Sequence, residues 1–324
     1  MLNPVLGRRL GVAAATLLLS GAPAAYAQTP YPSKPVRIVT ADAGGSSDFF
    51  VRVLAQELSK ALGQQFIVDN HGGAGSAPGE NAARAAPDGY SLLFYTMNLW
   101  ITPLLQKANY DPLADFAPIT LATKACSVLV ITPSLPVKSV KDLITLAKAK
   151  PGDLVYAHGS AGSASHLAGA MFRSMTGVQM LNVPYKGSAQ ALIDVMAGQA
   201  QLMFPNSAVV PPHLKSGKLK ALAVTSAERS PLFPDLPAVS ETVPGFAATT
   251  MNGFWAPART PEAIVRRLNQ EAVRIIRTPE MRSRLATNGI EPVGSSPQEF
   301  ATVIAEDMTR WAQVIKAAHI RADD

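Results

Sequence analysis

The chain is poor in the residues that build disulfides, zinc clusters and membrane anchors. Its one cysteine, Cys126, excludes an intramolecular disulfide and a cysteine zinc cluster. Cys126 opens the mostly apolar run 126–131, so we expect it to be a small buried side chain. After residue 27 no apolar run is long enough to cross a membrane as a helix.

The short motifs of common catalytic and nucleotide-binding sites are missing as well. H-E-x-x-H, C-x-x-C, G-x-S-x-G and G-x-x-x-x-G-K do not occur. The run 73–79 follows a predicted strand, but Pro78 stands where a dinucleotide-binding loop has its third glycine. We therefore interpret Gly73 and Gly75 as turn residues, and we expect no metal and no organic cofactor.

Charge is present but not concentrated. The chain carries 29 Lys and Arg against 23 Asp and Glu, a formal net charge of +6, and only 6% of its residues are aromatic. The basic residues are scattered and form no stripe interleaved with aromatics, which argues against nucleic-acid binding. A mildly positive surface does suit an anionic solute.

The first 27 residues have the pattern of an export signal. Arg8 and Arg9 form a basic start, residues 10–19 an apolar run, and 25–27 a small-x-small cleavage site. We expect cleavage after Ala27 and a soluble mature protein, from Gln28 onward, in the periplasm or outside the cell. The arginine pair leaves the general secretory and twin-arginine routes open, with the first favoured by the surrounding residues.

Strand-like and helix-like segments alternate along most of the remaining chain, which predicts an α/β fold. We expect largely parallel sheets with helices on both faces, in two lobes that form a clamshell of the type II-like periplasmic binding protein kind. The predicted divisions are 28–126 for the first lobe, 127–249 for the second and 250–324 for a return to the first. Predicted strands cover 36–39, 65–69, 91–96, 154–157, 180–183, 202–204, 219–225 and 251–256; predicted helices cover 49–62, 79–86, 140–149, 163–175 and 189–197, with two or three more between 261 and 318.

A glycine and hydroxyl loop, residues 40–48, joins the first predicted strand to the first predicted helix. Gly44, Gly45, Ser46 and Ser47 lie in it. A loop at the amino end of a helix directs backbone N–H groups and a positive dipole end at one place, where a carboxylate or phosphate can bind. The alternative is a plain tight turn in which Ser47 or Asp48 caps the helix.

Further polar loops follow other predicted strands. They include 70–76, 157–163, 184–188 and 205–207. In open α/β sheets ligands bind outside the carboxyl ends of the strands, so these loops predict a solute site in a cleft between two lobes.

With these segments in order, the chain resembles the Bug or TctC family, the periplasmic solute receptors of tripartite tricarboxylate transporters. The resemblance runs from about Tyr31 to the end. The segments that carry it are 31–36, 44–48, 70–75, 85–90, 110–112, 166–169, 183–188, 215–219 and 222–226. Each is common on its own, and their order and spacing together are typical of the family.

The resemblance implies a two-lobed receptor that closes on a small carboxylated solute and delivers it to the membrane components of the transporter. It implies binding through loop N–H groups, hydroxyls and ordered water. The corresponding residues are Gly44, Gly45, Ser46, Ser47 and Asn98 in the first lobe, and Gly159, Ser160, Ser163 and Asn206 in the second. The expected state is a monomer without a cofactor.

The chain departs from the family pattern in the same loops. Asp42 stands where a small residue is usual, and an acid there would repel a carboxylate unless it points away or meets another part of the solute. His158 stands where serine or asparagine is common, and Pro205 where an acid is frequent. These changes leave the identity of the solute open.

Two other functions remain to be weighed against a transport receptor. His158 and His166 lie near serines, so a serine–histidine enzyme is conceivable, although a triad is defined by geometry and not by sequence proximity. A receptor that docks on a signalling partner would use the same fold. Among the aromatic residues, Phe49 and Trp100 fall near the expected mouth, where they could cover an apolar solute.

Overall fold

The structure is a computed structural model, which describes residues 31–41, 46–71, 76–159, 162–185, 187–287, 289–318 and 320. The expected export signal with its cleavage site, and Asp42, Gly44, Gly45 and Ser160, lie outside these residues. None of the described helices is long and apolar enough to span a membrane.

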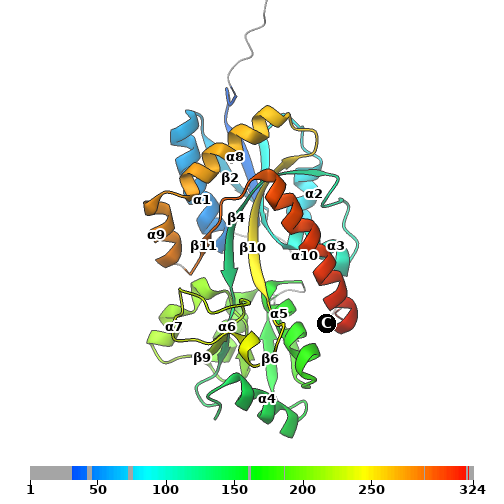
Figure 1. Ribbon diagram of the computed structural model, residues 1–324, viewed down its shortest axis with the longest axis vertical. Coiled ribbons are helices and arrows are strands. Elements are labelled where there is room, and N and C mark those ends of the chain that lie inside the picture. Colours follow the sequence, from blue (N-terminus) through cyan, green and yellow to red (C-terminus); the bar gives the residue numbers. More distant parts are fainter. Residues whose placement is uncertain are drawn as a thin grey trace, which may run out of the picture. The chain divides into compact units, whose positions relative to one another are not determined.

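One mixed sheet has six strands in the order β11-β4-β10-β3-β1-β2 (Figure 1). Its strands are β1 (Val36–Thr40), β2 (Phe66–Asn70), β3 (Ser91–Thr96), β4 (Phe116–Cys126), β10 (Thr249–Pro257) and β11 (Glu291–Pro292). Its helices are α1 (Ser46–Leu62), α2 (Ala77–Ala83), α3 (Asn98–Leu105), α8 (Glu262–Ile276), α9 (Pro279–Thr287) and α10 (Pro297–Ala318).

Helices cover both faces of this sheet, because successive strand side chains point to opposite sides. On β3, Phe94 packs in a cluster with the apolar stripes of α1, α8 and α9. Its neighbours Leu93 and Tyr95 pack in a second cluster that contains Trp100 of α3 and Trp311 of α10. The six-stranded sheet is therefore buried between two helical layers.

The second sheet has five strands in the order β7-β6-β8-β5-β9. Its strands are β5 (Val128–Ile131), β6 (Val155–His158), β7 (Leu181–Pro184), β8 (Leu202–Met203) and β9 (Lys220–Val224). The helices of this region are α4 (Val140–Ala149), α5 (Ala164–Thr176), α6 (Ser188–Met196) and α7 (Pro211–Lys215), with two short 3₁₀ turns, Ser207–Val209 and Val239–Glu241.

The expected α/β class is confirmed, but the expectation of largely parallel sheets holds for only part of each sheet. β1, β2 and β3 pair in parallel, as do β6, β7 and β8. The long strands β4 and β10 pair antiparallel with each other, and β5 pairs antiparallel with β8 and β9. The reason is topological: β4 carries the chain from the first sheet to the second and β10 carries it back, so the two run in opposite directions.

Two segments carry the chain between the sheets, and one threonine holds them together. Ser127 alone separates β4 from β5, and the segment 225–248 separates β9 from β10, which begins at Thr249. The hydroxyl of Thr225, just after β9, accepts a hydrogen bond from the Ser127 backbone at 2.8 Å and donates one to the Ala248 carbonyl at 2.5 Å. This fully buried side chain fixes the spacing of both crossings.

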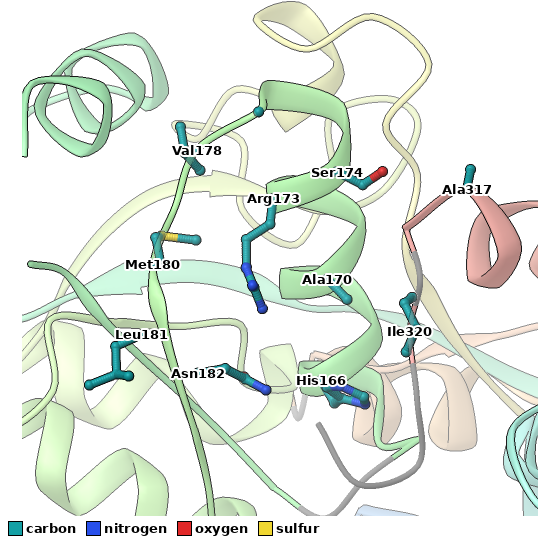
Figure 2. Close-up of a pocket in the computed structure, with 11 residues that line it drawn as sticks. His166, Ala170, Arg173, Ser174, Val178, Met180, Leu181, Asn182, Ala317 and Ile320 are labelled. Carbon is teal, nitrogen blue, oxygen red and sulfur yellow. The ribbon is translucent and has the colours of Figure 1, made fainter. Parts of the chain in front are cut away.

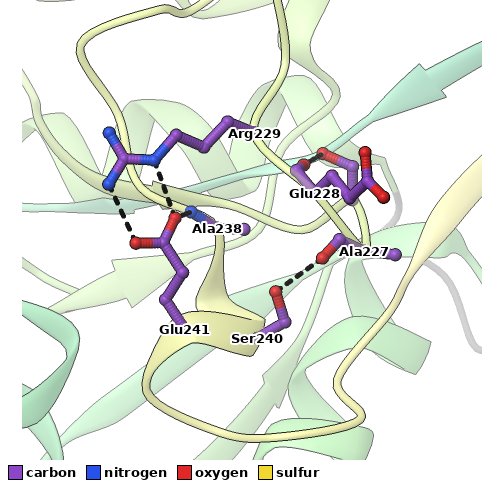
Figure 3. Close-up of polar contacts among 7 residues, drawn as sticks. Ala227, Glu228, Arg229, Ala238, Ser240 and Glu241 are labelled. Atoms are coloured by element: carbon purple, nitrogen blue, oxygen red, sulfur yellow. Dashed lines mark hydrogen bonds and ion pairs between the residues drawn. The ribbon is translucent and has the colours of Figure 1, made fainter.

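The proline-rich segment after β9 is irregular, and polar contacts close it into a loop (Figure 3). The Arg229 guanidinium donates two hydrogen bonds of 2.8 Å to the two carboxylate oxygens of Glu241. Glu241 also accepts from the Ala238 backbone at 2.9 Å. The hydrogen bond from Arg229 is the main reason that the pKa of the Glu241 carboxyl is lowered.

Several local predictions are confirmed. Three helices end the chain's described part. Cys126 is buried and free. The first helix begins at Ser46, three residues before the predicted start, because polar Ser46, Ser47 and Asp48 form its first turn.

Candidate ligand-binding site

The first group of candidate residues lies at the amino end of α1. β1 ends at Thr40 and α1 begins at Ser46, so the predicted strand, loop and helix order is confirmed. Ser47 sits in the first helical turn, where backbone N–H groups point out of the helix end. The Ser47 hydroxyl is already engaged, because it donates a 2.6 Å hydrogen bond to the side-chain oxygen of Asn252.

Asn252 of β10 is a site residue that the sequence analysis missed. It is 3% exposed, and its amide nitrogen donates to the Thr123 hydroxyl on β4 at 3.0 Å. It pairs across the sheet with Thr96, the last residue of β3. Its one signal in the sequence is an amide within a strand that is otherwise largely apolar.

The acid that follows Ser47 is neutralised within the helix. Asp48 is 6% exposed and lies 3.0 Å from the Arg52 guanidinium, one turn later. It also accepts a 2.8 Å hydrogen bond from the Asn70 side chain at the end of β2. Asn70 in turn donates to the Ala41 carbonyl at 2.8 Å. The network anchors the start of the glycine loop, and it pairs the Asp48 charge, which removes part of the repulsion that an anion would meet there.

Asn98 and Trp100 belong to α3, a helix that the sequence analysis did not predict. Asn98 opens the helix two residues after β3, and its backbone N–H donates to the Thr96 hydroxyl at 3.2 Å. Trp100 is fully buried, and its indole donates to the Asp307 carboxylate at 2.8 Å. The hypothesis that Trp100 covers a solute is therefore wrong, because the core of α3 and α10 encloses it.

The second group of candidate residues lies between β6 and α5. Ser163 is the N-cap of α5, and its hydroxyl accepts from the His166 backbone at 3.3 Å and contacts the Ser165 hydroxyl at 3.1 Å. The Gly159 backbone donates to the Ser165 hydroxyl at 3.1 Å. A Cβ at Gly159 would lie 2.7 Å from the Ser188 hydroxyl, so a side chain at this position would require Ser188 to shift. Ser165 and Ser188 thus join Ser163 in a hydroxyl cluster that the sequence analysis had not assembled.

His158 does not line an open cleft. It is fully buried, stacked on Tyr156 at 5.3 Å and on His166 at 4.6 Å between ring centroids. Burial lowers its pKa from the ordinary 6.5, so the ring is neutral near pH 7. His166 is 1% exposed, and its Nδ1 accepts from the Gly162 backbone at 3.0 Å. The two stacked, buried histidine rings therefore support the loop between β6 and α5 from inside the protein.

Asn206 lies beside the crossing between the sheets. Its side-chain oxygen accepts from the Ala208 backbone at 3.0 Å, which caps the 3₁₀ turn Ser207–Val209, and it forms an isolated bridge with Ser127. The next residue, Ser207, contacts the segment after α9, because its hydroxyl donates to the Gly289 carbonyl at 2.7 Å.

The structure assembles the candidates into separate groups. Ser47 and Asn98 flank the Thr96 and Asn252 pair, and Gly159 and Ser163 share the hydroxyl cluster. Within the described part of the chain no hydrogen bond joins the first group to the second. The second loop does approach the end of α3, because a Cβ at Gly162 would lie 3.3 Å from the Leu105 side chain. No set of three or more His, Cys, Asp or Glu residues among those described could hold a metal ion.

Residues 50–320 match the model of one protein family, described as the tripartite tricarboxylate transporter family receptor, TctC. The chain belongs to the TctC family. The resemblance drawn from the short segments is thereby confirmed.

Three relatives of this TctC receptor are similar to it over nearly its whole length. Protein BugT of Bordetella pertussis is 33% identical, with 95% of this chain and 97% of that protein aligned. Rpa4515 of R. palustris, solved with adipate, is 35% identical with a TM-score of 0.84, over 90% of this chain and 99% of that one. MatC of Rhodopseudomonas palustris, solved with bound malate, is 30% identical with a TM-score of 0.79, over 88% and 100%.

These likenesses settle the fold and the class of the TctC receptor. Its fold is that of two-lobed periplasmic binding proteins, and the family and its structural neighbours are solute receptors and not enzymes. The serine–histidine alternative is therefore abandoned. The buried stack of His158 on His166 accounts for both rings structurally.

Proposed function

We propose that this receptor binds a small organic carboxylate between its two groups of loop residues and delivers it to the membrane components of a tripartite tricarboxylate-type transporter. The match to the receptor family over residues 50–320 carries the proposal. The adipate and malate found with two of its structural neighbours support a carboxylated solute.

The proposed contacts from the first group are the loop and helix start at Gly44, Gly45, Ser46 and Ser47, with the Asn98 amide beside them. The amino end of α1 supports this assignment, because its N–H groups and dipole favour an anion. Since Ser47 donates its hydroxyl proton to Asn252, its contribution to the solute carboxylate is its backbone N–H.

The proposed contacts from the second lobe are Gly159, Ser160 and Ser163 between β6 and α5, and Asn206 beside the crossing between the sheets. The amino end of α5 supports them in the same way, since Ser163 is its N-cap. The hydroxyl cluster at Gly159 supplies rotatable O–H donors that suit a carboxylate.

We further propose that the lobes divide at 126/127 and 249/250 and move about the two crossings. The hydrogen bonds that join Thr225 to Ser127 and to Ala248 support this proposal. They hold the two crossings together at one point, about which the two sheets can tilt. A solute that contacts both groups would shift the receptor toward its closed state.

The proposed site of action is the periplasm, after removal of residues 1–27. The basic start, apolar run and small-residue cleavage pattern support export, and membership of a periplasmic receptor family agrees with it.

A thermal-shift titration of the chain from Gln28 onward tests the proposal. The panel contains adipate, malate and other mono-, di- and aromatic carboxylates, each with its neutral amide. Binding to the folded state raises Tm by mass action, so one carboxylate should raise Tm while its amide does not. The variant Ser46→Ala/Ser163→Ala should lose most of that shift and still fold.

Ser139→Ala is the matched control. Like Ser163, Ser139 caps a helix through its hydroxyl, so its loss costs about 1 kcal/mol of stability without touching the candidate loops. Its carboxylate shift should equal that of the wild type. An undiminished shift in the double variant would refute the site, and equal shifts from acids and amides would refute carboxylate recognition.

A further inference from the structure

A cavity away from the candidate loops lies between α5, β7 and the end of the chain's described part (Figure 2). Its volume is about 820 Å³. The wall from α5 is one helical stripe, His166, Ala170, Arg173, Ser174 and Gly177. The other walls come from Val178, Met180, Leu181, Asn182, Ala317 and Ile320.

Among the described residues, the Arg173 guanidinium is the one charged group in this lining, and no described carboxylate pairs with it. Figure 2 shows the side chain directed into the cavity, back along α5 toward His166. Among the residues that the structure describes, Arg173 makes no ion pair and no hydrogen bond through its side chain. Its charge acts on the buried rings behind it, since it contributes to lowering the pKa of His158. A half-buried cation without a partner is a position where an anion is stabilised.

The other residues of the lining indicate the chemical character of the rest of the anion. The Asn182 side chain points into the same space, where its amide nitrogen can donate a hydrogen bond to an anion. The Ser174 hydroxyl lies at the edge. Most of the remaining lining side chains are apolar, and the rim residue Leu181 is 55% exposed.

We infer that this cavity is a second binding site, for a small organic anion with an apolar body. The carboxylate pairs with Arg173, Asn182 supplies a hydrogen-bonding amide, and the aliphatic walls cover the body. The site does not share the proposed solute residues: Ser163 caps the start of α5, whereas Arg173 lies in its last turn. Ala317 lies in α10, which packs on the six-stranded sheet, and Ile320 follows that helix. The occupant would therefore contact helices from the regions of both sheets.

Calorimetric titration of the chain from Gln28 onward with hexanoate tests the inference, with hexanamide as the neutral probe. Hexanoate should bind with a Kd on the order of 1 mM, as one buried ion pair and a short apolar chain allow, and hexanamide should not. Arg173→Ala should weaken hexanoate at least about tenfold. Asn182→Asp keeps the shape of the side chain and places a fixed negative charge near the cavity's cation, so it should weaken hexanoate to a similar extent.

Arg282→Ala is the matched control, because Arg282 is an exposed arginine on α9, remote from this lining. It should leave the hexanoate Kd within about twofold. The variant Ser46→Ala/Ser163→Ala should also leave it unchanged, which separates this site from the proposed solute site. The inference is overturned if hexanoate does not bind, if Arg173→Ala with a wild-type melting temperature binds it as tightly, or if the serine variant alone abolishes binding.

Discussion

The Ser47 hydroxyl donates a 2.6 Å hydrogen bond to the side-chain oxygen of Asn252, although 205 residues separate them. The Asn252 amide nitrogen donates to Thr123 at 3.0 Å. One buried amide thus joins the first turn of α1 to both long strands, β4 and β10. The position of the proposed anion-binding helix end therefore depends on the strands that lead to the second sheet.

Asn252→Ala should lower the free energy of unfolding by about 1–3 kcal/mol, because it leaves the buried Thr123 hydroxyl and the half-buried Ser47 hydroxyl with fewer partners. Urea denaturation measures the change. Thr250→Val is the matched control on the same strand. The Thr250 hydroxyl is buried and has no hydrogen-bond partner among the described residues, so its loss should cost less than about 0.5 kcal/mol. Equal losses in the two variants would show that the Asn252 bridge contributes nothing.

Acid should destabilise the protein through His158. Burial holds its pKa in the folded state below the ordinary 6.5. As the pH falls below about 6.5, the unfolded chain binds a proton that the folded chain does not, so stability is full above that pH and decreases below it. The Gly159 backbone and the Asn182 side chain act to raise the pKa of His158, but burial outweighs them, and the charge of Arg173 lowers the pKa further.

His158→Phe keeps a stacked ring and removes the titrating group. Urea denaturation at pH 7.5 and 5.5 should show a smaller loss of stability in this variant than in the wild type. His213→Phe, on the half-exposed part of α7, should retain the wild-type pH dependence. An unchanged pH dependence in His158→Phe would assign the acid sensitivity to other groups.

Gly169→Ala should destabilise the protein by about 1–3 kcal/mol through overpacking. The Tyr156 ring lies directly over Gly169, and an added Cβ would overlap it. Tyr156 cannot move aside without losing its hydrogen bonds to the Ser165 and His166 carbonyls. Thermal melting should show the decrease in Tm. Gly187→Ala, with extended φ of −162° and open space around a new Cβ, should melt like the wild type.

Regular local patterns made much of the fold predictable. The apolar spacing of α1 and α8 and the cap at Ser139 depend on neighbours within a few turns, so the sequence suffices to place them. α3 was missed because residues 98–105 are short, almost wholly apolar and interrupted by Pro103. Such a run lacks the polar face that distinguishes a helix from a buried strand.

The candidate site was predictable only in part, for a related reason. Ser47, Asn98, Gly159 and Ser163 follow strands, and that order is visible in the chain. Asn252, Ser165 and Ser188 join them only through tertiary contacts. His158 and Trp100 looked like residues of the cleft, but packing encloses both rings completely.

The sequence by itself determined the α/β class, the strand–loop–helix units and the family resemblance, because each depends on local patterns and their order. Only the tertiary structure decided the antiparallel pairing of β4 with β10, the Asn252 bridge and the convergence of Arg173 and Asn182 on one cavity. These features join residues far apart in the chain. Their geometry follows from how the two sheets pack and connect, which no local pattern encodes.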